Sequence, residues 1–238
     1  VNGNVEISNC NISGVVSYTM SENTECIGGV VGVVNYKADF VLKDMTVDLE
    51  YVIPSSVRSI GGVVGYLNSP TSLNLSNVVN RSKKTLYVKE SRYGTGGLLG
   101  YLESSSKIKV NDCSNYMNIE SGSPMVGGIV GYYSEPTEKS VVNELYNCTN
   151  AGAIYSDFGN VGGIVGISEF VKISNCVNIG DISSNNASLA KDGEIGGIGG
   201  IVGTYKAKRI TVMNNTLCSC VNMGYVSSEI EGNSAGIV

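Results

Sequence analysis

Short runs of alternating hydrophobic and polar residues recur along the chain, and glycine or asparagine bounds them. In FVKISNC at 170–176, Val171 and Ile173 alternate with polar residues, and GDIS at 180–183 and GGIVGTY at 199–205 follow as further apolar runs. Runs of this length with period two predict β-strands, and no window keeps a helical period. We therefore predict an all-β chain with three short strands in each such stretch.

A glycine-rich hexamer of the form GG[IV][VL]G recurs through the chain. It is found at 27–32, 60–65, 95–100, 126–131, 161–166 and 199–203, and SAGIV at 234–238 is its last copy. Successive copies lie 31 to 37 residues apart, which indicates a repeat of about 35 residues. The paired glycines are predicted to be structural repeat positions: Gly28, Gly29, Gly61, Gly62, Gly96, Gly97, Gly127, Gly128, Gly162, Gly163, Gly199 and Gly200.

A second motif, N-C-x-N-x-G-x-I, keeps the same period. Clear copies are at 147–154, 175–182 and 219–226, looser ones at 9–16 and 112–119, and degenerate ones at 44–51 and 77–84. It predicts a structural ladder of two residue types, made by Cys10, Cys113, Cys148, Cys176 and Cys220 and by Asn115, Asn150, Asn178 and Asn222. Because Met45 and Val78 replace the cysteine, a buried thiol ladder is favoured, with disulfides between adjacent repeats as the alternative.

The two motifs divide the chain into one domain of seven units. Their approximate bounds are 1–34, 35–67, 68–102, 103–133, 134–168, 169–205 and 206–238. One unit buries too few apolar side chains to offset the entropy of ordering it, so neighbouring units must share their burial. We expect a segment of a longer array.

Stacked repeats of this kind predict a parallel β-solenoid of about seven coils. Each asparagine would stack where the coil bends, and the glycines would allow a positive φ and close backbone approach at corners. The variable stretches 133–140 and 183–195 would leave the coil as loops. A seven-bladed β-propeller is the alternative fold, although units of about 35 residues are short for four-stranded blades.

The alternation of GG[IV][VL]G-Y with N-C-x-N-x-G-x-I resembles the Glug-type repeat over essentially the whole chain. That repeat occurs in large bacterial surface proteins, including the non-catalytic part of some IgA-cleaving metalloproteases, and in repetitive protist surface proteins. The resemblance implies a right-handed β-helix in an extracellular, adhesin-like polypeptide. It carries over no catalytic residue, because the metalloprotease motif H-E-x-x-H needs histidine.

Composition excludes several kinds of chemistry. The chain has no histidine, so it contains no imidazole base or imidazole metal ligand. The net charge is −5 without a basic run, which argues against a nucleic-acid partner, and no apolar stretch is long enough to span a membrane. The hexamer lacks the lysine of a P-loop and the spacing of a dinucleotide-binding loop, so we expect no cofactor.

The remaining candidate sites are weak. The carboxylates Asp157, Glu169, Asp181, Asp192 and Glu194 are expected on loops or outward positions, and KDGE at 191–194 has too few carboxylates for a confident calcium site. Tyr66, Tyr101, Tyr132 and Tyr205 follow the hexamer and form either a sugar- or protein-binding stripe or packing over corner glycines. Of six glycosylation sequons, Asn80 and Asn186 fall in predicted loops.

These observations predict a non-enzymatic repeat segment of a secreted or cell-surface protein. It would act as a rigid stalk, a fibre or an adhesive surface, and bind other copies of the protein, a host or cell-surface protein, or a glycan. The alternative is a carbohydrate-active β-helix enzyme, a polysaccharide hydrolase or lyase, which would need a carboxylate cluster on one face.

Overall fold

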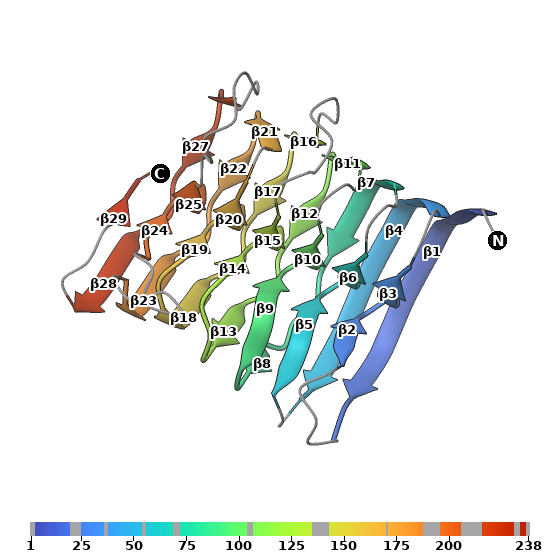
Figure 1. The fold of residues 1–238 in the computed structure, drawn as a ribbon, viewed down its shortest axis with the longest axis horizontal. Helices are drawn as coiled ribbons and strands as arrows, with labels where there is room; N and C mark the ends of the chain where they lie inside the picture. Colours follow the sequence, from blue (N-terminus) through green and yellow to red (C-terminus); the bar gives the residue numbers. More distant parts are fainter. Residues whose placement is uncertain are drawn as a thin grey trace.

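The computed structural model of the chain describes residues 3–19, 25–35, 38–53, 56–68, 72–103, 107–134, 143–169, 171–187, 196–205, 216–230 and 234–236. These residues form β-strands and no helix, and every strand pairing among them is parallel. The strands stack as a β-solenoid, with the two termini at opposite ends (Figure 1). The predicted all-β parallel solenoid is therefore confirmed.

Four sheets run along the solenoid, and we name them A to D. Sheet A contains β1 (Gly3–Ser17), β4 (Ala38–Val52), β7 (Ser72–Asn80), β11 (Lys107–Asn111), β12 (Ser114–Asn115), β16 (Asn143–Tyr146), β17 (Thr149–Asn150), β21 (Val171–Ser174), β22 (Val177–Asn178), β26 (Leu217–Cys218) and β27 (Val221–Asn222). Sheet B contains β2 (Cys26–Gly28), β5 (Val57–Gly61), β9 (Ser91–Gly96), β14 (Val126–Gly127), β19 (Val161–Gly162), β24 (Ile198–Gly199) and β29 (Ser234–Ala235).

The other two sheets consist of short strands, at most one from each coil. Sheet C contains β3 (Val31–Val34), β6 (Val64–Leu67), β10 (Leu99–Leu102), β15 (Val130–Tyr133), β20 (Val165–Ser168) and β25 (Val202–Tyr205). Sheet D contains β8 (Leu86–Val88), β13 (Ile119–Ser121), β18 (Ile154–Phe158), β23 (Ile182–Asn186) and β28 (Val226–Ile230).

Along the chain, each full coil contributes strands to sheets A, D, B and C in that order, and the next coil begins again in sheet A. The coil therefore has four sides, not the three strands per unit that the sequence predicted. The difference lies in the hexamer, which contributes to two strands. Its first two residues, Val126 and Gly127, form β14 of sheet B, and Val130 begins β15 of sheet C. In the inner copies both central apolar residues, such as Ile129 and Val130, are fully buried.

The number of coils is slightly smaller than the seven expected. Among the described residues, seven strands form sheet B and five form sheet D, because β1 and β4 each continue for 15 residues within sheet A. In later coils the strand is interrupted at the equivalent position: β12 of sheet A ends at Asn115, and β13 of sheet D begins at Ile119. The solenoid thus has about five full coils preceded by two with a longer flat side.

A single hydrophobic core runs through the middle of the solenoid. Inward positions stack on the same residue type in successive coils: Leu75, Val110, Leu145 and Ile173 follow one another in sheet A. Each is at most 1% exposed, because the coils above and below cover it as well as its own coil. Parallel in-register pairing between repeats excludes the β-propeller, whose blades are separate sheets.

Candidate functional site

The first asparagine of N-C-x-N produces the kink in sheet A. Asn or Asp occupies this place in six coils and Ser in the seventh, always with φ between 51° and 56°: Asn9, Asp44, Asn77, Asp112, Asn147, Asn175 and Ser219. Asn and Asp tolerate this left-handed conformation better than other side-chain-bearing residues. Their exposed side chains also bond between coils, since Asn147 Nδ2 donates to Asp112 Oδ1 at 2.6 Å.

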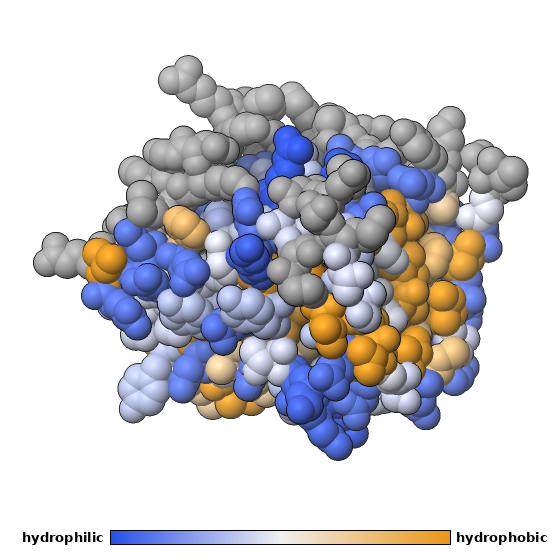
Figure 2. Space-filling model, turned by 90° about the horizontal axis from the view of Figure 1, so that it is seen from below, coloured by the Kyte–Doolittle hydropathy of each residue, from blue (hydrophilic) through white to orange (hydrophobic). Residues whose placement is uncertain are grey.

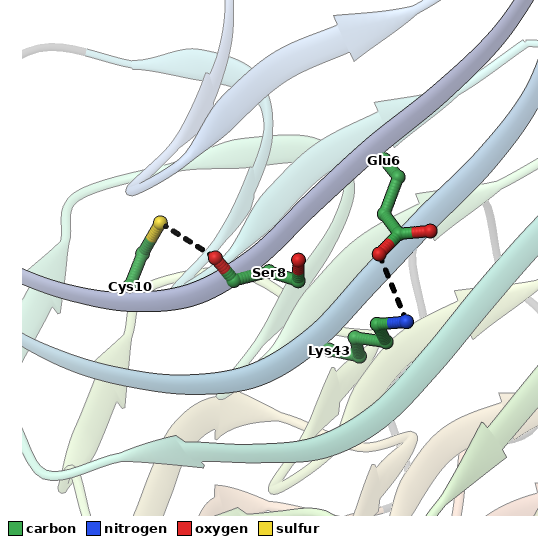
Figure 3. Close-up of polar contacts among 4 residues, drawn as sticks. All are labelled: Glu6, Ser8, Cys10 and Lys43. Atoms are coloured by element: carbon green, nitrogen blue, oxygen red, sulfur yellow. Dashed lines mark hydrogen bonds and ion pairs between the residues drawn. The ribbon is translucent and has the colours of Figure 1, made fainter.

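The cysteine that follows the kink points inward. Cys113, Cys148 and Cys176 are fully buried, and the register places Met45 and Val78 above them in the same column. Each thiol donates to the carbonyl oxygen two residues earlier, as Cys10 does to Ser8 at 3.1 Å (Figure 3). All seven cysteines are free thiols, so the structure has the thiol ladder and not the disulfide alternative.

Burial and contact between thiols make Cys148 and Cys176 hard to ionise. Contact with the Cys148 thiol, together with burial, raises the pKa of Cys176 to about 12. Contact with Cys113 raises the pKa of Cys148 in the same way, and burial raises the pKa of Cys26 to about 11. A nucleophilic role needs a thiolate, so the ladder is structural.

The second asparagine of the motif forms a hydrogen-bonded ladder at the corner between sheets A and D. Asn115 Nδ2 donates to Asn150 Oδ1 at 2.9 Å, Asn150 to Asn178 at 2.8 Å, and Asn178 to Asn222 at 2.7 Å. Each Nδ2 also donates to the carbonyl oxygen two residues on in its own chain, for example from Asn150 to Gly152 at 2.8 Å. This second bond bends the backbone, and so the predicted asparagine stack is the device that turns the corner.

Asn80 belongs to this column, which corrects its assignment to a loop. It pairs with Asn115 in register, is fully buried, and donates from Nδ2 to the carbonyl of Gly97 at 2.8 Å. A glycan could not be attached there without extracting the side chain from the interior. The motif alignment held the signal, since NVVN at 77–80 matches N-C-x-N with only the cysteine replaced.

The paired glycines are required by close packing and not by a positive φ. Among the described glycines only Gly14 has a positive φ, which corrects that part of the expectation. A Cβ on Gly128 would lie under 3.0 Å from both the carbonyl oxygen of Gly163 and the side chain of Asn150. Gly97, Gly163 and Gly200 meet the next coil's carbonyl and asparagine in the same way. The two sequence motifs are therefore one packing unit.

Tyr51 takes the place of the asparagine in the second coil. The ladder position there is Val47, which has no carboxamide, and β4 continues past it to Val52 without a break. The Tyr51 hydroxyl instead donates to the carbonyl of Gly62 at 2.8 Å, the bond that Asn80 makes to Gly97. A Cβ on Gly29 would meet that hydroxyl as one on Gly62 would meet Asn80.

The tyrosines of the predicted stripe lie on the outer face of sheet C. Tyr66, Tyr101 and Tyr132 are in register, with ring centroids 5.3 and 5.1 Å apart. Tyr205 is not part of the stripe. Its register partner is Ser168, whose partner in the preceding coil is the inward-facing Tyr133, so Tyr205 belongs to a different column. Tyr132 also packs beside Gly94, where an added Cβ would lie 3.3 Å from the tyrosine Cβ.

Residues from sheet B cover the stripe. The Arg58 guanidinium lies 4.8 Å from the Tyr66 ring centroid and 5.1 Å from that of Tyr93, which stacks on Tyr101. Tyr66 is buried, and its hydroxyl donates to the Glu103 carboxylate at 3.0 Å. Burial and that carboxylate raise the pKa of Tyr66. The cluster is mostly closed, which favours packing over ligand binding.

An open groove of about 420 Å³ lies on the outer face of sheet D and was not found from the sequence. Its lining residues are Tyr87, Glu120, Ser121, Gly122, Tyr155 and Asp157. Tyr87, Glu120 and Tyr155 are register partners from three successive coils, so they stand side by side on one face. The Tyr155 hydroxyl donates to Asp157 Oδ1 at 3.0 Å.

The other carboxylates that the sequence singled out are spread over different sides. Glu169, 4% exposed, follows β20 and accepts from the Tyr132 hydroxyl at 3.3 Å, while Asp181 precedes β23 and accepts from the Tyr225 amide at 2.9 Å. Asp192, Glu194 and KDGE lie outside the described residues. Among the described residues, no three His, Cys, Asp or Glu side chains group as metal ligands.

The second glycosylation candidate, Asn186, is half-buried at the end of β23, so the expected loop begins later than residue 183.

No helix in the described part of the chain is long and apolar enough to cross a membrane.

Comparison of the chain with protein-family models, with curated proteins and with solved structures found no match.

Proposed function

We propose that the chain is a structural and adhesive repeat segment of a secreted or cell-surface protein, and that it is not catalytic. The observation that carries this proposal is the in-register stacking of all four sheets over buried cysteine, asparagine and glycine columns. Such a body holds outward side chains at a fixed spacing of about 4.8 Å along the axis. The resemblance to Glug-type repeats of surface proteins supports the same function.

The ladders favour a load-bearing role. The termini lie at opposite ends of the solenoid (Figure 1), so a pull on the chain acts along the stacking axis. Adjacent coils are held together by backbone bonds on every side, such as Val130 N to Ile164 O at 3.0 Å, as well as by the asparagine ladder. A rigid stalk or fibre needs this kind of distributed cross-linking.

Exposed apolar side chains support association with other copies of the chain. In the last coil Tyr225 is 83% exposed, and Val221, Met223 and Ile230 are also exposed. In the first coil Val5 and Val15 are exposed, and Figure 2 shows apolar surface gathered toward the end where the N-terminal coils lie. Unpaired strand edges beside apolar surface are templates for pairing. The outer faces would bind a host or cell-surface protein or a glycan.

Surface labelling tests this proposal. An antibody raised against the chain should label intact cells of the source organism as strongly as permeabilised ones, and beads coated with the chain should adhere to a cell surface that soluble chain then blocks. Labelling that requires permeabilisation would overturn the proposed location. Beads that adhere no better than beads coated with an unrelated protein of similar charge would overturn the adhesive role.

A further inference from the structure

We propose that the groove on sheet D binds the ammonium group of a lysine side chain on a partner polypeptide. This inference rests on the proposed role of the outer faces as binding surfaces, and it names the chemistry that one of those faces would recognise. Three features carry it: the spacing of two tyrosines, the carboxylate between them, and the lack of an ion pair to that carboxylate within the described part of the chain.

The spacing follows from the strand register. Tyr87, Glu120 and Tyr155 are direct partners in β8, β13 and β18. Neighbouring strands lie about 4.8 Å apart, so the two tyrosine backbones are roughly 10 Å apart with Glu120 midway. A group bound over Glu120 thus has an aromatic residue about 5 Å to either side, within the range of roughly 6 Å at which a cation is attracted to a ring.

The position of one ring is fixed by a hydrogen bond. The Tyr155 hydroxyl reaches Asp157, two residues further along the same face of β18, so the ring lies along the strand. Asp157 Oδ2 reaches toward Gly122 at the bottom of the groove, where a Cβ would lie 3.4 Å from it. Because residue 122 has no side chain, the space between Tyr87 and Asp157 stays open.

The groove carries negative charge, and the exposed Lys89 beside it forms no ion pair with either of its carboxylates. Glu120 and Asp157 form no ion pair with the described lysines and arginines, and no lining residue is basic. Burial, the hydrogen bond to Asp157 and the nearby Asp157, Glu229 and Glu120 carboxylates together raise the pKa of Tyr155 to about 12. An electron-rich ring beside carboxylates is the environment that favours an ammonium ion over an anion or a neutral apolar group.

The test titrates acetyl-Gly-Lys-Gly-amide into the isotope-labelled chain and follows the amide resonances of Glu120, Gly122 and Tyr155. Saturable shifts confined to the groove are expected, with affinity falling as salt is added. Glu120→Gln and Tyr87→Ala should each weaken binding roughly fivefold, since each removes one of two attractions of similar size. Tyr87 is 54% exposed, so its removal should leave the fold intact.

Two matched variants serve as controls. Glu144→Gln removes the same charge and Tyr146→Ala the same ring from sheet A, and both should bind the peptide as the unchanged chain does. Equal binding by acetyl-Gly-norleucine-Gly-amide, no saturable shift, or equal weakening by the control variants would overturn the proposal. Tighter saturation of the groove by maltose than by the lysine peptide would overturn it in favour of a saccharide. A failure here with adhesion intact leaves the proposed function standing.

Discussion

Replacement of Asn150 by alanine removes one member of the asparagine ladder at its centre. Asn150 is fully buried and makes three side-chain hydrogen bonds: it donates to Gly152 O and Asn178 Oδ1 and accepts from Asn115 Nδ2. Each bond contributes about 1 kcal/mol net, and unpaired buried partners cost more. Asn150→Ala should therefore lower the free energy of unfolding by about 3–5 kcal/mol.

Urea unfolding followed by circular dichroism measures this loss. The matched control is Asn118→Ala, because Asn118 is exposed and accepts a single bond, from the Ala153 amide at 2.9 Å. The control should lose less than about 1 kcal/mol. At a pH low enough to keep the acid neutral, Asn150→Asp keeps the shape and the acceptor but has one O–H donor in place of two N–H donors, so its loss should fall between those of the two alanine variants. Equal losses for Asn150→Ala and Asn118→Ala would refute the claim that the buried ladder stabilises the coil.

Three further changes test other columns. Gly128→Ala should destabilise the chain by several kcal/mol or prevent folding, because the added Cβ would lie under 3.0 Å from the Gly163 backbone and the Asn150 side chain. Gly3 has open space around it, so Gly3→Ala should have a melting temperature close to that of the unchanged chain. Tyr51→Phe should cost about 1–2 kcal/mol in urea unfolding because it leaves the Gly62 carbonyl without its donor, and an unchanged midpoint would contradict the equivalence of Tyr51 with the ladder asparagines. A thiol reagent should label exposed Cys218 in the native chain but Cys113, Cys148 and Cys176 only on unfolding. Since folding raises the pKa of Cys176 from 9.0 to about 12, its contribution to stability should be full below pH 9 and lost as the pH rises toward 12. Four of the seven thiols are not buried, so rapid native labelling of more than four would be inconsistent with the buried column.

The repeat itself was visible in the sequence because stacked positions face identical neighbours. The cysteine and asparagine columns were predicted at the right residues, and the replacement of cysteine by Met45 and Val78 correctly indicated an apolar site. A parallel solenoid followed from these columns, since only in-register stacking gives the same residue the same environment in every coil.

The corners of each coil were harder to predict from the sequence. Local periodicity does not show that the hexamer turns a corner, because its apolar pair is buried on both sides of the bend. Strands β1 and β4 continue past the ladder position because Ile12 and Val47 have no carboxamide side chain there. Tyr51, which makes the equivalent hydrogen bond in the second coil, lies four residues from that position. Two reasons were predicted for the paired glycines. The positive φ was wrong, but the close backbone approach was correct, and it involves atoms one coil away.

The groove on sheet D could not be found from motifs. Tyr87, Glu120, Tyr155 and Asp157 occupy variable positions in three repeats whose lengths differ, so no common spacing connects them. They meet only because the register of β8, β13 and β18 aligns them. Outward positions of a solenoid carry no packing constraint, which leaves them free to differ and makes them poor sequence signals.

In-register parallel stacking of successive coils is tested most directly by nuclear magnetic resonance couplings across backbone hydrogen bonds. The structure predicts a coupling from the Val130 amide nitrogen to the Ile164 carbonyl carbon, and likewise from Gly97 to Gly127 and from Ile119 to Ala153. Each joins residues about one repeat apart on a different side of the coil. Couplings that instead join antiparallel neighbours within one repeat would contradict the solenoid.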